Sequence, residues 1–441
     1  MNSERVPGAA RPPSGGRWPA DVGTALLAAA TMVATLPGRT HGVGLVTEPL
    51  LAEFGLGRVP FAALNFWATV VGAAFCLPAG SAIDRFGTRN VLAVVATGLG
   101  AAVVAMAGLP PAAASLGLPA PEWLAGGGAL TVAVPPALFL LVLLTRGLGQ
   151  SALSVVSLAI VGKGAGARPA RTIGLYSCLV ALGFMAAFAA VKAVFEGTAA
   201  GWRDVWRAIG VALVAFGTLA PWFLRRGGVA RRAGRGAGAA DGPTLRDALA
   251  APAFWVFGLA TGFYALVAAG MALFNQSILA ERGFDRSVFL TVTSAAPLVG
   301  LVANLVGGWA AARVPIGRVA AAGLVLQAAA LACFPAVGSL PGVYAYAAAM
   351  AFGGGLLTVV FFAVWREGWG TSSLGAIQGA AQVLTVVASA AGPLVLAVGR
   401  ETLGSYAPIA LRLSAASALL AVATLLVPLP DPRPLPRSPA A

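Results

Sequence analysis

The sequence has 441 residues, of which 59% are apolar and 10% are charged, and its mean hydropathy is +0.86. Ordinary soluble domains are far more polar, so the composition indicates an integral membrane protein. The net charge of +14 does not predict binding to nucleic acid, because the basic residues lie in short segments between apolar stretches and not on one face of a soluble domain.

Twelve apolar stretches follow one another along the chain, each long enough to cross the ~30 Å hydrocarbon core of a bilayer as a helix. Helices are expected because a lone strand would leave its backbone groups unpaired in lipid, and the sequence lacks the alternating pattern of a membrane β-barrel. The predicted fold class is therefore an all-α membrane protein. The expected spans are 22–46, 60–79, 89–109, 131–161, 172–194, 205–224, 253–278, 288–308, 316–337, 342–364, 373–398 and 405–429.

The longest polar segment, from Arg225 to Trp255, divides these spans into two groups of six and is rich in Gly, Ala and Arg, as a linker would be. Within it, Thr244 can cap a short helix at the membrane surface, with a plain loop as the alternative. The expected organisation is a disordered cytoplasmic tail at 1–20, an N-terminal six-helix half at 21–225, a cytoplasmic linker at 226–252, a C-terminal six-helix half at 253–429 and a cytoplasmic tail at 430–441.

The placement of basic residues predicts the orientation in the membrane. Of the 29 Lys and Arg residues, Arg39 and Arg146 are set apart as buried within spans. With a cytoplasmic N-terminus, the other 27, in connecting segments or toward span ends, divide into 19 on the cytoplasmic side and 8 on the opposite side. By the positive-inside rule, this predicts a multi-pass protein of the cell (inner) membrane with both termini in the cytoplasm.

The first span contains the segment TLPGRTHGVGL, which places Arg39 and the only histidine, His41, in an apolar run. A charge at the centre of the bilayer costs at least about 2.5 kcal/mol, so such residues normally face a polar cavity. Thr31, Thr35 and Arg39 recur every fourth residue and form one polar stripe, whereas His41 lies about 200° further around an unbroken helix. Pro37, Gly38, Gly42 and Gly44 weaken the regularity of the helix in this segment and predict a kink.

Other spans carry similar polar stripes, and the fourth contains a second buried guanidinium group at Arg146. We take these polar residues as candidates for substrate binding, although uncharged ones can simply bond to neighbouring helices. His41 is the candidate proton-coupling residue because its ordinary pKa is near neutral, with capping of a helix turn as the alternative. The substrate-binding candidates are Arg39, Arg146, Gln150, Tyr264, Asn275, Gln378 and Gln382.

The loop after the second span, GSAIDRFGTRN, resembles the signature loop of the major facilitator superfamily, G-x-x-x-D-R-x-G-x-R. The corresponding loop of the second half, GGWAAARVPIGR, is a degraded copy with Ala312 in place of the aspartate, as an internal duplication predicts. The resemblance covers the whole chain and implies the fold of a secondary transporter. We assign to a conformational gating loop the residues Gly80, Asp84, Arg85, Gly87, Arg89, Gly308, Arg313 and Arg318.

Three shorter segments are similar to the monocarboxylate and oxalate/formate transporter branch of that superfamily. They are GVGLVTEPLLAEFGLGR, TLRDALAAPAFWVF and LGAIQGAAQ. The resemblance implies a basic residue in the outer half of helix one, where Arg39 and His41 stand. The branch usually adds charged residues in helix eight or a lysine in helix eleven, and this sequence has neither inside those spans.

The signs of the buried charges constrain the substrate. No Asp or Glu lies in the middle of a span, and the nearest is Glu48 at the outer end of the first. Two arginines without internal carboxylates predict an electropositive cavity, which an anion complements. The predicted function is secondary transport of a small organic anion, monocarboxylate-like, by alternating access, with H⁺ as the candidate coupling ion.

Two other functions remain open: efflux of an amphipathic or lipid-like compound, and a transport-dead sensor or scaffold. An enzyme is disfavoured because the spans show no paired carboxylates, metal-binding cluster or Ser/His pair, and the sequence has no P-loop for ATP. The expectation is therefore a monomer without cofactor or metal, whose partners are the anionic substrate and the lipid bilayer, and not nucleic acid.

Overall fold

The computed structural model describes residues 20–110, 116–119, 131–164, 169–198, 201–224, 243–370 and 374–430. The predicted tails, apart from residues 20 and 430, and the linker residues 226–242 lie outside this part of the chain. Within it, eleven helices are long and apolar enough to cross a membrane, and Val22–Gly38 forms a shorter apolar helix. Together they account for the twelve predicted spans.

The N-terminal half contains six spans, the first and fourth of which are interrupted. Its elements are α1 (Ala20–Val33), the 3-10 turn η1 (Leu36–Gly38), α2 (Thr40–Gly44), α3 (Thr47–Phe54), α4 (Arg58–Ala73), α5 (Cys76–Gly108), α6 (Pro136–Thr145), the π-helical segment η3 (Arg146–Leu153), α7 (Ser154–Gly164), α8 (Pro169–Gly197), α9 (Trp202–Leu219) and η4 (Ala220–Phe223).

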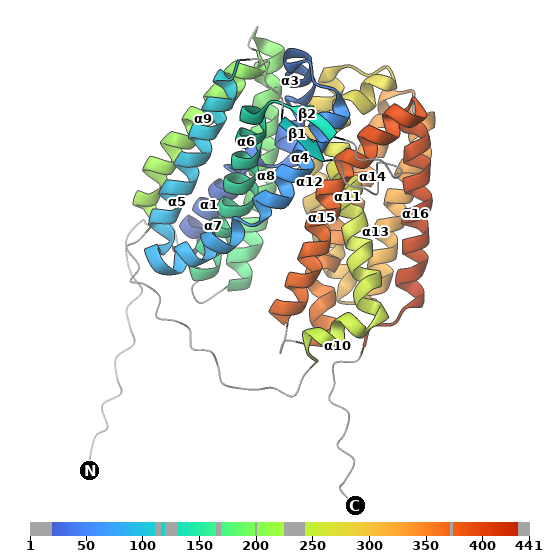
Figure 1. Ribbon diagram of the computed structural model, residues 1–441. Helices are drawn as coiled ribbons and strands as arrows, with labels where there is room; N and C mark the ends of the chain where they lie inside the picture. The colour runs from blue at the N-terminus through green and yellow to red at the C-terminus, as the bar shows by residue number, and fades with distance from the viewer. Residues whose placement is uncertain are drawn as a thin grey trace, which may run out of the picture.

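The C-terminal half lies beside it, as Figure 1 shows by the change from blue and green to yellow and red. We call the two ends of the bundle the α3 end, at the top of Figure 1, and the α10 end, at the bottom. The elements of this half are α10 (Leu245–Ala250), α11 (Pro252–Glu281), α12 (Arg286–Ala311), α13 (Ile316–Cys333), η5 (Phe334–Ala336), α14 (Leu340–Trp369), α15 (Leu374–Leu403) and α16 (Tyr406–Leu426).

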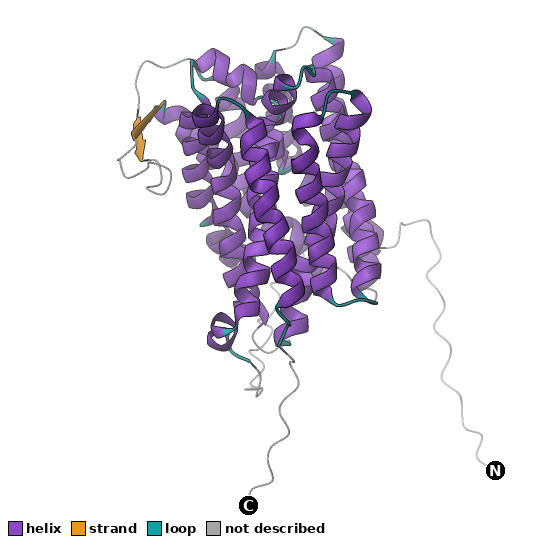
Figure 2. Ribbon diagram, turned by 90° about the vertical axis from the view of Figure 1, so that its right-hand side faces the viewer, coloured by secondary structure: helices purple, strands orange, loops and turns teal. Residues whose placement is uncertain are grey.

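Two short strands, β1 (Leu116–Pro119) and β2 (Thr131–Val134), form an antiparallel pair with Leu116 opposite Val134. They lie outside the helical bundle near the α3 end (Figure 2). The sequence analysis placed residues 131–134 inside the fourth span, but the helix begins at Pro136, because Pro135 is extended and caps it. The pair is an addition to the all-α bundle and does not change its architecture.

The first span is broken, and more sharply than a kink would be. α1 ends at Val33, η1 follows, and Arg39 is extended with φ −91° and ψ 151° before α2 begins. Pro37 lies inside η1, where it cannot donate a backbone hydrogen bond. The break ends α1 before Arg39, and His41 belongs to a separate short helix, α2.

Local sequence signals also explain two other turns. Gly87 has φ 81° and ψ 152°, a backbone conformation open essentially only to glycine, and it marks the turn inside α5 between the second and third spans. Thr244 caps α10 as predicted: its hydroxyl accepts a hydrogen bond from the backbone N–H of Asp247 at 3.3 Å, and the Asp247 carboxylate accepts one from the Thr244 N–H at 2.8 Å.

An ion pair at the α3 end fastens α3 to α9. Glu53 accepts hydrogen bonds from Arg203 Nε at 2.7 Å and from Trp202 Nε1 at 2.6 Å, and the other guanidinium nitrogens of Arg203 bond to the carbonyl oxygens of Ala107 and Leu109. Slight desolvation works against ionisation of Glu53, but the two hydrogen bonds outweigh it and lower the pKa of its carboxyl group.

The buried apolar side chains form two clusters that differ in which halves they join. The first, which we call the shared core, includes Phe61 and Leu64 of α4 together with Leu394 and Ala397 of α15, and α4 packs against α15. The second, the α10-end core, lies within the C-terminal half and is built around the rings of Phe254, Trp365 and Trp369.

Polar contacts join the halves at the α3 end as well. Arg286 of α12 donates a hydrogen bond to the Leu45 carbonyl at 3.3 Å, and its guanidinium lies 3.9 Å from the centre of the Phe195 ring of α8. The neighbouring pair, Glu196 and Ser287, forms a side-chain hydrogen bond between the same two helices. Apolar and polar contacts therefore both close the α3 end.

Helices α11 and α15 touch backbone to backbone, and this contact gives a stability prediction. A Cβ at Gly392 would lie 1.9 Å from the Leu266 carbonyl oxygen, so Gly392→Ala must push the helices apart. We expect this substitution to destabilise the purified protein by about 1–3 kcal/mol, measured as a lower thermal unfolding temperature in detergent. Gly379→Ala on the same helix is the control, since a Cβ there meets no atom within 4 Å. Equal unfolding temperatures for the two variants would contradict this packing.

Candidate functional site

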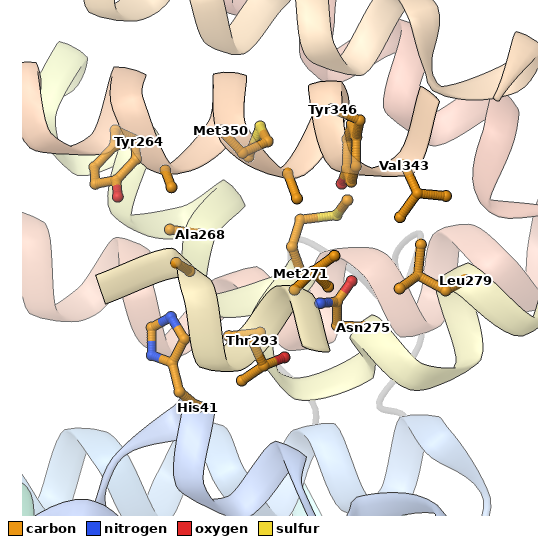
Figure 3. Close-up of a pocket in the computed structure, with 15 residues that line it drawn as sticks. His41, Tyr264, Ala268, Met271, Asn275, Leu279, Thr293, Val343, Tyr346 and Met350 are labelled. Carbon is orange, nitrogen blue, oxygen red and sulfur yellow. The ribbon is translucent and has the colours of Figure 1, made fainter. Parts of the chain in front are cut away.

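A cavity of about 130 Å³ lies where the two halves meet. Its walls come from α11, α12 and α14 of the C-terminal half, and His41 of α2 is its lining residue from the N-terminal half. Figure 3 shows the imidazole of His41 reaching toward the cavity, with Tyr264 and Tyr346 on the far side. The polar side chains around it are His41, Tyr264, Asn275, Thr293 and Tyr346.

The position of His41 depends on close contact between α2 and α11. A Cβ at Gly44 would lie 2.2 Å from the Ala272 carbonyl oxygen, so only glycine permits this approach. Gly42 is equally crowded, because a Cβ there would lie 1.8 Å from the Leu36 carbonyl oxygen of η1. The glycines of the segment HGVG thus hold α2 between the broken first span and the cavity wall.

Arg146 of the fourth span holds the broken first span by hydrogen bonds. It is 1% exposed, and its Nη1 donates hydrogen bonds to the Gly38 carbonyl at 2.9 Å, Thr40 Oγ1 at 3.2 Å and Gln150 Oε1 at 3.2 Å. Its Nη2 bonds to Asn65 Oδ1 of α4. Because η1 does not continue as an α-helix, the Gly38 carbonyl needs such a donor in a medium without water.

The π-helical winding of η3 accompanies this arrangement. Gly149 of η3 packs directly on η1, since a Cβ at Gly149 would lie 2.9 Å from Gly38 Cα. A Cβ at Gly38 would in turn lie 2.3 Å from the Thr145 carbonyl oxygen. Single π-helical turns occur often at functional sites, and this one lies where the first and fourth spans meet.

Arg39 is only partly buried and lies among α1, α7 and α8. Its Nε donates to Thr35 Oγ1 at 2.7 Å, and its Nη2 lies 3.2 Å from Ser154 Oγ and 2.8 Å from Met32 Sδ. Its guanidinium also lies 5.5 Å from the centre of the Phe184 ring, within range of a cation–π interaction. The predicted stripe of Thr35 and Arg39 is therefore confirmed as a direct hydrogen bond.

The electrostatic character of the site is positive. Among the described residues, neither Arg39 nor Arg146 has a carboxylate within ion-pair distance, and no Asp or Glu lines the cavity. His41 is exposed, whereas Gly42 and Val43 beside it are buried.

The structure brings together some of the candidate residues and separates others. Tyr264 and Asn275 line the cavity with His41, as their shared helix face predicted. Arg146 and Gln150 lie together outside the cavity lining, where Arg146 donates hydrogen bonds to the Gly38 carbonyl and to Gln150; their role in substrate binding stays a prediction. The α15 candidates are not part of the cavity lining: Gln378 and Gln382.

Sequence reasoning missed the contribution of α12 and α14 to the cavity. Tyr346 and Met350 lie one turn apart on α14, and Thr293 lies on α12. A tyrosine in the apolar tenth span was an available signal, because a buried phenol usually needs a polar neighbour or a cavity. The thioethers of Met271 and Met350 gave no signal, since methionine is common in ordinary cores.

The signature-loop residues lie at the α10 end, away from the cavity. The guanidinium of Arg89 lies 5.6 Å from the ring centre of Trp222, and that of Arg313 lies 4.4 Å from the ring centre of Trp309. In the second loop, Pro315 occupies the position that corresponds to Gly87 in the first loop, and it caps α13. Gly308 lies within helix α12. The side chain of Asp84 lies outside the described residues.

Three solved structures share this architecture. The chain aligns with a bacterial homologue of the human lysosomal transporter Spinster, in an inward-facing and unoccupied conformation, at a TM-score of 0.65 and 16% identity over 93% of this chain and 95% of that one. It aligns with a variant of the nucleoside transporter NupG at a TM-score of 0.66 and 16% identity, over 93% of this chain and 100% of that one. It also aligns with a D-xylose–proton symporter at a TM-score of 0.63 and 15% identity, over 94% of this chain and 97% of that one.

No protein-family model and no curated protein sequence matches the chain. At such low identity the structural neighbours establish the fold and not the substrate. The protein is a multi-pass membrane protein with the twelve-helix fold of the major facilitator superfamily. The resemblance found in the signature loop is thereby confirmed at the level of the fold.

The role of Arg146 gives a second stability prediction. Arg146→Met keeps a side chain of similar length but leaves the Gly38 carbonyl and Asn65 Oδ1 without their donor, which costs about 1–3 kcal/mol for each buried group. We expect a clear fall in the thermal unfolding temperature in detergent. The control is Arg207→Met, because Arg207 is exposed and pairs only with exposed Asp204. The same small change for both variants would refute a structural role for Arg146.

Proposed function

We propose that the protein is a secondary active transporter that carries a small organic anion, of the monocarboxylate type, across the cell membrane by alternating access. The observation that supports it most directly is the pair of guanidinium groups without carboxylate partners, Arg39 and Arg146, beside a cavity between the two halves. An unpaired positive charge in a region of low dielectric favours a negative ligand and repels a cation.

The size of the cavity supports a small substrate. Pockets for drug-sized ligands commonly have volumes of about 300–1,000 Å³, whereas this one has about 130 Å³. A ligand held wholly within this volume would be a small molecule, and the efflux alternative is tested by whether larger amphipathic compounds are carried. The other alternative, a transport-dead sensor or scaffold, is distinguished by a transport assay, because such a protein would carry no substrate.

We further propose that transport is coupled to protons through His41. His41 is the only histidine, it lines the cavity, and it is exposed to the same space that an arriving anion would enter. An imidazolium formed together with anion binding would neutralise the carboxylate, so the two would move together as in symport. The guanidinium groups cannot do this, because arginine remains protonated.

The orientation proposed from the positive-inside rule places the α10 end and both termini in the cytoplasm. The contacts at the α3 end, including those of Arg286 with Leu45 and Phe195, would then close the outer side. We propose that this is the inward-facing state of a monomer, and that the signature loops at the α10 end come together in the opposite state. Substrate would enter from outside only after the α3-end contacts part.

The proposed charge selectivity predicts how replacing the side-chain amide of Asn65 by a carboxylate changes transport. Asn65→Asp would place a carboxylate against the Arg146 guanidinium, where the amide oxygen already accepts a hydrogen bond. We expect uptake of radiolabelled pyruvate or lactate into proteoliposomes to fall at least about tenfold, because the ion pair cancels positive charge near His41. The unfolding temperature should not fall.

The same assay includes two comparisons. Arg39→Ala should lose uptake, and Arg39→Lys should keep part of it, because lysine retains the charge. Collapse of the inward proton gradient should reduce uptake by the wild-type protein, and His41→Gln should be insensitive to that gradient. Anion uptake that is unchanged in both Asn65→Asp and Arg39→Ala would refute the proposed charge selectivity. Uptake by the wild-type protein that is unchanged when the proton gradient is collapsed would refute proton coupling.

Alternating access predicts that a covalent bridge across the α3 end stops transport. In a background where Cys76, Cys178 and Cys333 are replaced, the pair Glu196→Cys and Ser287→Cys joins α8 to α12. A short bis-methanethiosulfonate reagent should abolish uptake, and a reducing agent should restore it.

The matched control pair lies within one helix. It combines Lys192→Cys with Glu196→Cys. These positions are four residues apart on α8, and their native side chains form an ion pair. The same reagent should bridge them without affecting uptake, since no bridge crosses between the halves. Full uptake by the bridged α8–α12 pair would exclude opening at the α3 end.

A further inference from the structure

The cavity described above has two chemically different ends, and this difference bears on the kind of anion it takes. At one end stands His41 of α2, the short helix that follows Arg39 and begins at Thr40, whose hydroxyl accepts a hydrogen bond from Arg146. At the other end the wall is formed by Met271, Met350 and other apolar side chains, without Lys, Arg, Asp or Glu. A ligand that matches both ends has a carboxylate on an apolar body.

The volume sets the size of that body. An engineered apolar protein cavity of about 150 Å³ accepts benzene, and this cavity measures about 130 Å³. An acetate ion would leave much of the apolar wall without contacts, and unfilled apolar space forfeits dispersion and transfer energy. A two-ring compound would exceed the volume. One six-membered ring, or a branched chain of similar size, fits it.

The walls are held in place by contacts that favour a fixed shape. The hydroxyl of Tyr264 packs against α14 at Gly354, where a Cβ would lie 2.0 Å from that oxygen. The Tyr346 ring lies 5.4 Å from that of Phe334, which supports it from behind. The two phenol rings therefore define the far boundary of the cavity, while the flexible thioethers of Met271 and Met350 can adapt to a flat ring.

Aromatic rings have favourable partners in this wall. Sulfur–aromatic contacts with methionine and edge-to-face contacts with tyrosine each contribute beyond the burial of area. Asn275 and Thr293 add an amide and a hydroxyl that can hydrogen-bond a substituent on the ring. The lining thus combines aromatic, thioether and a few neutral polar groups, and the segment Gly38–Thr40, to which Arg146 is hydrogen-bonded, lies next to His41.

From these features we infer that the cavity binds a monocarboxylate whose apolar body is a single six-membered ring or a branched chain of that size, with the carboxylate at His41 and the ring between Met271 and Met350. This inference rests on the proposed anion transport and adds to it the substrate class. Pyruvate and lactate would then be carried as poor substrates.

The first test uses ligands alone, with the wild-type protein in detergent. A ligand that binds the folded state raises the unfolding temperature, so acetate, benzoate, 2-naphthoate and benzamide are titrated separately. Benzoate should bind about 10- to 100-fold more tightly than acetate, because it buries a ring, and more tightly than 2-naphthoate. Benzamide, which has the same shape without the charge, should give no shift. Acetate equal to benzoate, or benzamide equal to benzoate, overturns the inference.

The second test changes the cavity. Ala347→Leu narrows it and should reverse the preference between benzoate and acetate in proteoliposome counterflow, whereas Met350→Ala widens it and should admit 2-naphthoate. Ala418→Leu on the exposed face of α16 is the control and should keep the wild-type order. If Ala347→Leu does not fold, Met350→Ala and the ligand series still decide the question.

The outcomes distinguish a failure of this inference from a failure of the proposed anion transport. Uptake of all small carboxylates at similar rates, unaffected by Ala347→Leu and Met350→Ala, would overturn the ring-binding cavity and leave anion transport standing. Absence of binding and counterflow for every carboxylate tested would overturn both. Preference for neutral benzamide would keep the ring site and refute the anion.

Discussion

The structure depends on one buried side chain and the broken helix that it holds. The first span is interrupted at Pro37 and Gly38, and an interrupted helix inside a bilayer leaves carbonyl groups that must find donors within the protein. Arg146 supplies such a donor to the Gly38 carbonyl, and its other hydrogen bonds go to the Thr40 hydroxyl and the Asn65 side-chain oxygen. The same hydrogen bonds keep a buried guanidinium group beside the broken first span, so this architecture and the charge selectivity proposed above have one origin.

The site follows from the contact between halves that this break makes possible. Because α2 leaves the line of α1, it can press Gly44 onto Ala272 of α11 and direct His41 into a cavity otherwise walled by the C-terminal half. The positive region thus belongs to one half, and the apolar wall belongs to the other. A relative motion of the halves would alter the distance between the two parts of the ligand site, which is the property that alternating access requires.

Local sequence signals predicted much of this architecture, because they act over a few residues. Span lengths, the cap at Thr244, the turn at Gly87 and the break near Pro37 are all fixed by hydropathy or backbone chemistry in their own segment. The cavity was predicted only in part. Periodicity assigned Tyr264 and Asn275 to one face correctly, but it could not tell whether the polar face of a helix meets a cavity or another helix.

Arg146 illustrates that limit, since its partners Gly38 and Asn65 are 108 and 81 residues away in sequence. Gln382 illustrates the reverse case, since it lies on a polar helix face but does not line the cavity described above. Packing of distant spans decides such questions, and no segment contains that information by itself.

The shared core has a thermodynamic consequence. Leu394 and Ala397 of α15 lie in one dry cluster with Phe61 and Leu64 of α4, whereas the α10-end core belongs to the C-terminal half. Parting the α3 end wets apolar surface, and wetted apolar surface raises the heat capacity. In the proposed alternating access, the balance between the two orientations of the site would therefore have a curved dependence on temperature, so cooling and warming would not shift it in simple proportion.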